Sequence, residues 1–205
     1  MNGIRTLPIR LDPLPGEALD SWLEAIAARL DSPLLHMLPA FSLDAETTER
    51  SRRGGPPPNW TICLQPEELD ALATATQVDP ATLRAMTLET YADNAIVIDM
   101  PRREVNRTQL WGRGGGSRYC PDCLTATGGR WQLSWRLSWA FACLTHRRLL
   151  ANICPTCGKA PRTRVHSLTH VPQLGRCARP SPSSESKGPG TTRCGGSLLE
   201  TEPSA

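Results

Sequence analysis

The sequence has few of the residues from which large hydrophobic cores are built. Its 205 residues include only 2 Phe and 2 Tyr, against 19 Pro and 16 Gly. Small cores usually need an additional constraint, such as a bound metal. We therefore expect two small units rather than one large domain.

Long apolar runs are also missing. No stretch approaches the roughly 18 apolar residues of a membrane span, and residues 1–20 lack the apolar run of a secretory signal peptide. We therefore expect a cytoplasmic protein with no membrane partner. In a reducing compartment, paired cysteines are more often metal ligands than disulfides.

Acidic side chains are scarce in the second half of the chain. Residues 101–195 carry 16 basic and 3 acidic side chains, a net charge of +13, whereas residues 1–100 carry 7 and 15, a net charge of −8. The three acids, Glu104, Asp122 and Glu185, do not have the spacing of paired catalytic carboxylates. A zinc hydrolase would need such a group as its general base, so we expect no enzymatic activity.

The charge split favours contact between the basic half and a polyanion such as nucleic acid, while the acidic half docks a protein partner. A basic surface that only keeps the protein soluble is the alternative. The candidate phosphate contacts are the arginines that crowd the start of the basic half. They are Arg102, Arg103, Arg107, Arg113, Arg118, Arg130, Arg136, Arg147 and Arg148.

Seven of the eight cysteines follow residue 119, and the first four candidate ligands have the spacing of a zinc site. Two pairs with two intervening residues, Cys120 with Cys123 and Cys143 with His146, are separated by nineteen residues. Tetrahedral zinc takes four sulfur or nitrogen ligands, and each pair can place two of them on one tight turn. The spacing predicts a structural zinc ion at this site.

A second zinc ion is predicted from Cys154 and Cys157, which form another pair of the same spacing. Either Cys177 and Cys194 or His166 and His170 could complete its four ligands. We favour the cysteines because each follows an arginine, and the Cys194-Gly195 sequence is typical of a zinc turn. Two Zn²⁺ ions per chain would then take the place of a larger hydrophobic core.

Three helices are predicted in the acidic half. Apolar residues at helical spacing indicate an amphipathic helix over residues 17–30. Pro66, Glu67 and Glu68 favour a helix start and an end near Thr76, and Asp79 can cap a further helix from residue 80 towards residue 88. The last two resemble a helix-turn-helix, although Arg84 is the only basic side chain of the second helix, so packing or partner docking is the alternative to reading DNA.

Residues 131–141 alternate apolar and polar side chains, which suggests a strand, although the tryptophans also recur every four residues as in a helix. We expect these aromatic side chains to form the core beside the first zinc site. The loop over residues 44–58, the glycine-rich junction at 112–116 and the low-complexity run at 180–190 separate the structured segments.

The expected fold class is a small α+β protein. An N-terminal all-α unit over residues 1–100, with a helix-turn-helix-like pair at 66–91, precedes a zinc-finger or zinc-ribbon module with two zinc sites over residues 101–199. A mobile loop at 178–192 interrupts this module, and residues 200–205 form a tail.

Several motifs of the chain resemble the TniQ family of transposition proteins. Residues 7–23, LPIRLDPLPGEALDSWL, are similar to the family's N-terminal signature. RYCPDC at 118–123, GRWQLSW at 129–135, FACLTH at 141–146 and CPTCG at 154–158 are similar to its zinc region. By position, Cys120, Cys123, Cys143 and His146 match the family's first zinc site, and Cys154 and Cys157 begin its second.

The resemblance implies a non-catalytic accessory factor of cut-and-paste transposons, related to mercury-resistance elements and to target selectors such as TnsD. Such a factor links target DNA, or a nucleoprotein complex, to an AAA+ ATPase regulator and through it to the transposase. A homodimer is left open. The competing hypotheses are a zinc-containing DNA-binding transcriptional regulator and, least favoured, a zinc hydrolase.

Overall fold

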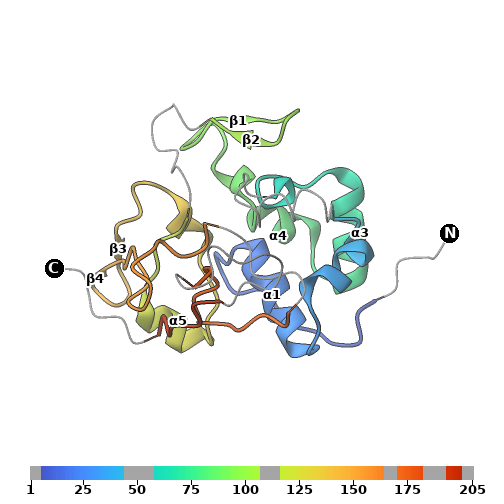
Figure 1. Ribbon diagram of the computed structural model, residues 1–205. Coiled ribbons are helices and arrows are strands. Elements are labelled where there is room, and N and C mark those ends of the chain that lie inside the picture. The colour runs from blue at the N-terminus through green and yellow to red at the C-terminus, as the bar shows by residue number, and fades with distance from the viewer. Residues whose placement is uncertain (1–5, 44–57, 107–115, 164–169, 182–192, 200–205) are drawn as a thin grey trace.

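A buried helix, α1 (Leu19–Arg29), lies at the centre of the molecule in the computed structural model (Figure 1). The structure describes residues 6–43, 58–106, 116–163, 170–181 and 193–199. Helix α1 confirms the helix expected over residues 17–30, but its polar side is not exposed to solvent. Nine consecutive residues from Leu19 to Ala27 are buried, including Asp20, Ser21 and Glu24.

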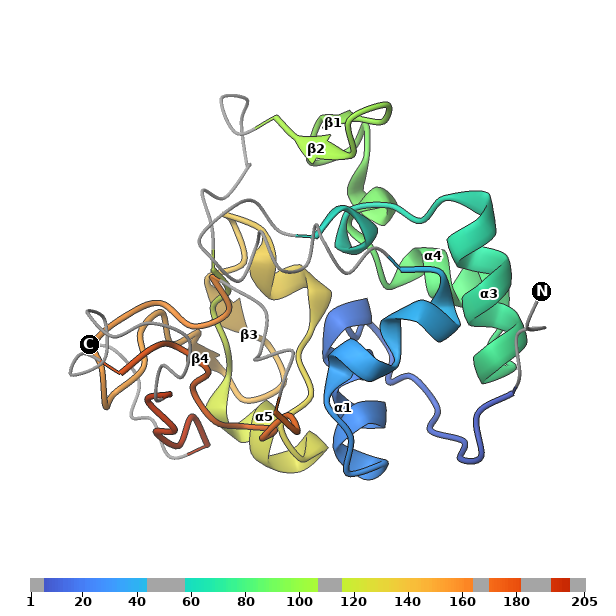
Figure 2. The same cartoon turned by 45° about the vertical axis from the view of Figure 1, so that its right-hand side comes forward.

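The remaining helices of residues 6–91, which we call the helical half, pack on one side of α1 (Figures 1 and 2). They are η1 (Leu34–His36), η2 (Leu38–Phe41), η3 (Asn59–Thr61), α3 (Pro66–Thr76), α4 (Pro80–Ala85) and η4 (Leu88–Tyr91). Their core contains the fully buried side chains of Trp22, Phe41, Trp60, Leu72 and Leu83.

Helices α3 and α4 begin where their capping residues predict. A capping box joins Gln65 and Glu68 at the start of α3, and Gln77 adopts a left-handed conformation that ends it. The Asp79 side chain accepts a hydrogen bond of 3.1 Å from the backbone nitrogen of Thr82 and so caps α4. Helix α4 ends at Ala85, earlier than the expected residue 88.

The described residues of 116–199, which we call the metal half, lie on the other side of α1 (Figure 2). They contain α5 (Pro121–Thr127), η5 (Leu133–Arg136) and an antiparallel hairpin of β3 (Ala142–Cys143) and β4 (Arg148–Leu149), paired as Ala142 with Leu149 and Cys143 with Arg148. A second hairpin, β1 (Ile98–Asp99) with β2 (Glu104–Val105), precedes this half and protrudes beside η4. The described chain is thus a small mixture of helices and two-stranded sheets.

The alternating residues 131–137 do not form the strand that their period suggested. Trp131, Leu133, Trp135 and Leu137 are buried and the residues between them are not, but the chain forms the short 3-10 helix η5. Their backbone bonds run to the start of the helical half, where Leu133 N donates to Gly16 O at 2.8 Å and Ala18 N donates to Trp131 O at 2.9 Å. Packing between the two halves therefore imposes the alternation without a regular sheet.

The two halves also meet through buried ion pairs along α1. The carboxylates all come from the start of the chain and the guanidinium groups from the metal half. The pairs are Glu17 with Arg130, Asp20 with Arg136 and Arg162, and Glu24 with Arg162. Part of the opposite charge of the two halves is therefore neutralised inside the molecule.

Glu17 and Arg130 form the most enclosed of these pairs. The Glu17 side chain is fully buried, and Arg130 donates to both of its oxygens, from Nε at 2.8 Å and from Nη2 at 2.5 Å. Such two-point contact matches the planar guanidinium to the carboxylate. Separating the two halves would leave each of these buried charges without its partner, which is energetically costly. The contact therefore favours one orientation of the halves.

None of the described helices combines the length and the apolar character that crossing a lipid bilayer requires.

Candidate metal centres

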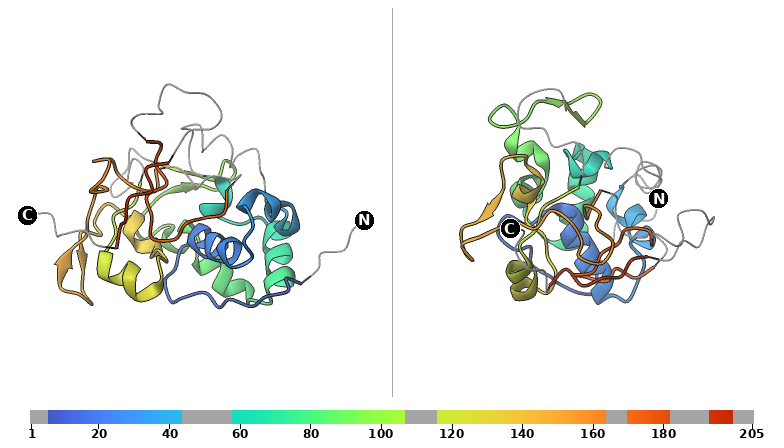
Figure 3. Two further views of the ribbon diagram at one scale, coloured as in Figure 1. Left: turned by 60° about the horizontal axis from the view of Figure 1, so that its bottom comes forward. Right: turned by 60° about the vertical axis from the view of Figure 1, so that its left-hand side comes forward.

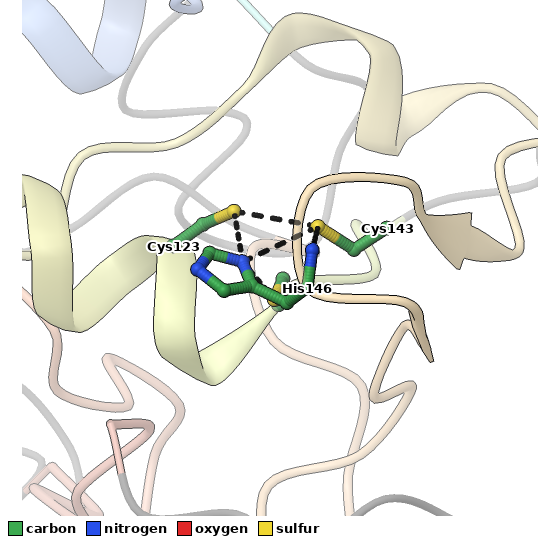
Figure 4. A group of neighbouring side chains, drawn as sticks. Cys123, Cys143 and His146 are labelled. Atoms are coloured by element: carbon green, nitrogen blue, oxygen red, sulfur yellow. Dashed lines mark hydrogen bonds between the residues drawn. The ribbon is translucent and has the colours of Figure 1, made fainter.

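The first candidate metal centre joins the start of α5 to the β3–β4 hairpin. Cys120 is the N-cap of α5 and Pro121 its first residue, so Cys123 lies on the first turn, facing back towards Cys120. Cys143 ends β3, and His146 lies in the turn before β4. Figure 4 shows the side chains of Cys123, Cys143 and His146 pointing towards one another.

The distances between these ligand atoms fit one metal ion. His146 Nδ1 lies 3.2 Å from Cys123 Sγ and 3.5 Å from both Cys120 Sγ and Cys143 Sγ, and the last sulfur is 3.5 Å from Cys123 Sγ. Tetrahedral zinc with bonds of about 2.3 Å to sulfur places two sulfurs about 3.8 Å apart. A disulfide would instead bring them to about 2.05 Å. The four residues could therefore hold a metal ion.

Three thiolates so close together would repel one another without a cation. Burial raises the pKa of the Cys120 thiol, and burial together with the neighbouring Cys143 raises that of Cys123. Burial opposes ionisation of Cys143 as well, but hydrogen bonds involving His146 and the other thiols lower its pKa to about 7. A divalent cation bound by the three sulfurs would favour their ionisation.

The second candidate metal centre consists of Cys154, Cys157, Cys177 and Cys194, whose sulfur atoms all lie within 4.8 Å of one another. Cys154 Sγ lies 3.8 Å from Cys194 Sγ, and Cys157 Sγ lies 3.8 Å from Cys177 Sγ. These separations equal the sulfur spacing of a tetrahedral zinc site, about 3.8 Å. The set could hold a second metal ion.

A tight turn holds the first pair of the second centre, and a backbone bond between two distant segments holds the other two ligands together. Gly158 N donates to Cys154 O at 2.9 Å, and Gly195 N donates to Cys177 O at 3.0 Å. Both glycines have positive φ, 67° and 65°, which other residues rarely adopt. Of the rival ligands, His170 is not in the cluster and His166 lies outside the described residues.

One hydrophobic cluster links the two centres. Cys120 and Cys143 of the first and Cys154 and Cys177 of the second share it with Tyr119 and the aromatic rings of Trp131 and Trp135. The two tryptophan rings meet edge to face, with centroids 5.7 Å apart. The expected role of these aromatics as core is confirmed for Trp131 and Trp135, but Trp139 is 36% and Phe141 64% exposed.

Four of the arginines that are candidate phosphate contacts bind partners within the protein. Arg130 and Arg136 are held in the ion pairs with α1, and Arg118 donates to the carbonyl oxygens of Ser138 and Ala140, both at 2.8 Å. Arg148 binds Asp122 at 2.8 Å. These guanidinium groups bind carboxylates of the helical half, and backbone carbonyls and Asp122 of the metal half.

The other candidate arginines divide into three groups. Arg103 donates to Glu68 and to the carbonyl oxygen of Cys63, so it ties the β1–β2 hairpin to α3. Arg102 and Arg147 are exposed. Arg107 and Arg113 lie outside the described residues.

Sequence reasoning missed the carboxylates of α1 and their partner Arg162. The Arg162 guanidinium is buried, binds Asp20 and Glu24 at 2.6 and 2.8 Å, and lies 5.1 Å from the ring centroid of Trp131. A signal was present, because acidic residues at 17, 20 and 24 recur at helical spacing on one face of a predicted helix. In a chain that also has an arginine-rich segment, an acidic helix face can be buried against that segment and need not be exposed to solvent.

A comparison with protein-family models matches the TniQ family over residues 8–150. That range spans more than half of the chain, from α1 to the first candidate metal centre. The chain belongs to the TniQ family. The resemblance to this family that the sequence motifs indicated is therefore confirmed.

Membership in the TniQ family associates the chain with DNA transposition and with a group of generally non-catalytic accessory proteins. The matched range includes all four residues of the first centre, whereas the second centre, from Cys154 onwards, lies beyond it. No curated protein matches the chain significantly.

Proposed function

We propose that this TniQ protein is a non-catalytic adaptor in DNA transposition, linking target DNA or a nucleoprotein complex to an AAA+ ATPase and the transposase. The observation that carries the proposal is the family match, which covers the helical half and the part of the metal half that holds the first candidate metal centre. A central helix held by buried ion pairs on one half and an apolar core on the other suits a protein that presents fixed surfaces to partners.

Both candidate metal centres hold structural Zn²⁺ in this proposal, one ion per centre. Cys120, Cys123, Cys143 and His146 would hold the first ion, and Cys154, Cys157, Cys177 and Cys194 the second. Soft thiolate donors in a tetrahedral arrangement favour zinc over magnesium or calcium. The first ion would fix α5 to the β3–β4 hairpin, and the second would fix the turn at Cys154 and Cys157 to the segments around Cys177 and Cys194.

The chemistry around the centres supports a structural role. A hydrolytic site needs an open coordination position and a carboxylate that can act as base. Asp122, next to Cys123, instead accepts a hydrogen bond from Arg148, and this contact lowers its pKa. Its carboxylate is thus used to fasten β4 to α5.

We also propose that residues 1–100 and 101–199 are separate units in sequence that function together, and that α3 and α4 form a helix-turn-helix-like pair facing a protein partner. Helix α4 has six residues, so it is about 9 Å long and short for reading several bases. The alternative, a DNA-binding transcriptional regulator, depends on Arg84, which is the basic residue of α4. An Arg84→Ala protein should keep its DNA affinity under our proposal and lose operator binding under the alternative.

The recruitment function can be tested by reconstitution with an AAA+ ATPase and a transposase of the kind that the proposal names. Labelled ATPase is expected to assemble on target DNA at lower concentration when the intact zinc-loaded protein is present, and transposition into that DNA is expected to rise. A protein with Glu17→Gln, which weakens the buried pair with Arg130, serves as a folding-sensitive control. Equal ATPase assembly with and without the intact protein would exclude the adaptor function.

Direct DNA contact is tested separately with the full chain, by titrating salt during binding of a fluorescent duplex. Phosphate contacts require affinity to fall steeply with salt. Replacing the exposed Arg102 and Arg147 by alanine should reduce the salt slope by about two, whereas a protein making no such contact shows no binding even at low salt. The second result would assign target contact to a nucleoprotein partner.

A further inference from the structure

The imidazole of His146 has two ring nitrogens, and either type can bind a metal ion. The spacing of Cys143 and His146 does not distinguish them, because histidines bind zinc in proteins through Nδ1 or through Nε2. The choice decides which nitrogen keeps a proton and where that N–H group points. The distances in the first candidate metal centre discriminate between the two nitrogens.

His146 Nδ1 is the nitrogen that faces the sulfur atoms. It lies 3.2 Å from Cys123 Sγ and 3.5 Å from the Sγ atoms of Cys120 and Cys143. A tetrahedral zinc ion, with bonds of about 2.0 Å to nitrogen and about 2.3 Å to sulfur, separates these ligand atoms by about 3.5 Å. Binding through Nε2 would instead hold Nδ1 roughly 5 Å from the sulfurs.

A hydrogen bond in the absence of a metal does not account for this arrangement. Nδ1 has either one N–H bond or one lone pair, and each points in a single direction, so one sulfur at most can be aligned with it. Three sulfurs nevertheless approach Nδ1 at nearly equal distances, and Cys123 Sγ and Cys143 Sγ are themselves 3.5 Å apart. Such similar separations are those of ligands around a central cation.

The turn between the two ligands favours Nδ1. Only Leu144 and Thr145 separate Cys143 from His146, and the backbone nitrogen of His146 donates to Cys143 Sγ at 3.5 Å. This contact holds the backbone of His146 close to the sulfur, and Nδ1 is the ring nitrogen nearer to the backbone. A turn this short therefore brings Nδ1 to the ion, whereas Nε2 would extend past it.

Nε2 of His146 lies outside the group of ligand atoms. In Figure 4 every dashed line that reaches the ring ends on Nδ1. His146 is not buried, and within the described part of the chain no residue forms a hydrogen bond with Nε2. The first centre also lies at the opposite end of the molecule from α3 (Figures 1 and 3), so the carboxylates of that helix do not reach the ring.

We propose that His146 binds the metal of the first centre through Nδ1, and that Nε2 carries the ring proton and donates a hydrogen bond to water. The inference rests on the proposed zinc function of this centre and adds the ligand atom and the tautomer. Metal-bound histidines generally donate their second N–H to a carboxylate, a carbonyl or water. At His146 the turn from Cys143 sets the orientation of the ring in place of an outer carboxylate.

Nuclear magnetic resonance of the full chain loaded with ¹¹³Cd tests the assignment. Cadmium takes the same thiolate ligands as zinc, and its nuclear spin couples to the nitrogen that it binds. The chain has 4 His, so ¹⁵N-histidine labelling gives a simple spectrum. The cadmium coupling is expected on Nδ1 of His146, which correlates strongly with one carbon-bound ring proton, whereas Nε2 correlates with both. In the zinc-loaded protein the ring proton should be on Nε2.

Two variants assign the signal. His146→Cys removes this imidazole but keeps four ligands for the metal, so the cadmium-coupled nitrogen signal should disappear while the metal content stays the same. His170→Ala, which changes a histidine outside both centres, is the matched control and should leave the coupled signal in place.

Cadmium coupling to Nε2 of His146 would overturn the proposal, as would a ring proton on Nδ1 in the zinc-loaded protein. Metal content, measured first, separates this failure from that of the zinc function. A chain that binds no metal would contradict both proposals, whereas two bound ions with a coupled Nε2 would contradict the nitrogen assignment alone. The ATPase recruitment measurement remains an independent test of the adaptor function.

Discussion

Asp20 shows how one buried carboxylate can organise an interface between two halves of a chain. It pairs with Arg136 and Arg162, and it is almost fully buried on α1. Burial alone would raise its pKa, but the two guanidinium groups outweigh burial and hold the pKa well below its usual range. The carboxylate therefore stays ionised in the folded protein, and its charge is part of the packing.

Substitution of Asp20 by Asn should lower stability in a pH-dependent way. Because the folded pKa lies below the unfolded value of about 3.9, the stabilisation is fully present above pH 4 and is lost as the pH falls through the folded pKa. The free energy of unfolding at pH 7 should fall by about 3 kcal/mol, since one partner of a buried pair is removed. Denaturant titrations from pH 7 to pH 3 should show the gap between the two proteins narrowing below pH 4, and a constant gap would contradict this account.

The ligand residues predict a second result at the same scale, in the metal content of single variants. Cys143→Ser and Cys177→Ser should each reduce the zinc bound from two ions per chain to one, because each removes a ligand from a different centre. His170→Ala, outside both clusters, should leave two ions. Mass spectrometry of the metal in dialysed protein measures these ratios, and a loss of zinc in the His170 variant would revive the rival ligand set.

At the scale of elements, the turn after α5 connects the two metal centres. Gly128 and Gly129 follow the helix with φ of 66° and 90°, and Gly129 N donates to Leu124 O at 2.6 Å. A Cβ on Gly129 would overlap the backbone of Leu174 and Gly175, whereas a Cβ on Gly128 would meet no atom within 4 Å. The close approach places the chain that leads to Cys177 against the end of α5.

These adjacent glycines offer a matched pair of substitutions. Alanine at either position costs about 1 kcal/mol from the left-handed backbone, and at Gly129 the overlap with Gly175 should add about 1–3 kcal/mol. Thermal denaturation should therefore show a clearly lower midpoint for Gly129→Ala than for Gly128→Ala. Equal midpoints would mean that the segment at Leu174 and Gly175 can move away from Gly129 at little energetic cost.

The elements also show why part of the structure could be predicted from sequence. Pro66, Glu68 and Asp79 are local signals, so the starts of α3 and α4 were predictable, and ligand spacing predicted which residues meet at the first centre. The alternation of residues 131–137 suggested a strand, but it reports only which side chains are buried. A 3-10 helix packed between the two halves buries the same alternate side chains as a strand would. The acidic residues at 17, 20 and 24 signal a charged face, but no local pattern identifies Arg130, 113 residues after Glu17, as the partner of that residue.

For the whole molecule, the ion pairs and a shared apolar cluster make the halves mutually dependent. Ala18, Ile62 and Leu88 of the helical half pack with Leu133 and Leu137 of the metal half. Glu17 and Trp131 are also bound through Ser21, whose hydroxyl donates to Glu17 and accepts from Trp131 N. Unfolding of the metal half should therefore remove contacts that stabilise α1.

Removal of zinc is expected to loosen α1, although it contributes no metal ligand. Chelation releases α5 and the hairpin, and with them the arginine partners of α1, so the amides of α1 should exchange hydrogen faster. Amides of α3, which packs on η2 and α4, provide the internal control and should be affected less. Hydrogen exchange with and without chelator measures both, and unchanged protection of α1 would show that the halves are uncoupled.

The carboxylates of α1 also affect what can be learned from pieces of this protein. A fragment starting near residue 101 would lack Glu17, Asp20 and Glu24, and would present Arg130, Arg136 and Arg162 as unpaired cations. Such a fragment would adhere to DNA through groups that the intact molecule keeps inside. The DNA affinity of the fragment would therefore reflect arginines exposed by removing residues 1–100. The DNA affinity of this protein should be measured on the full chain.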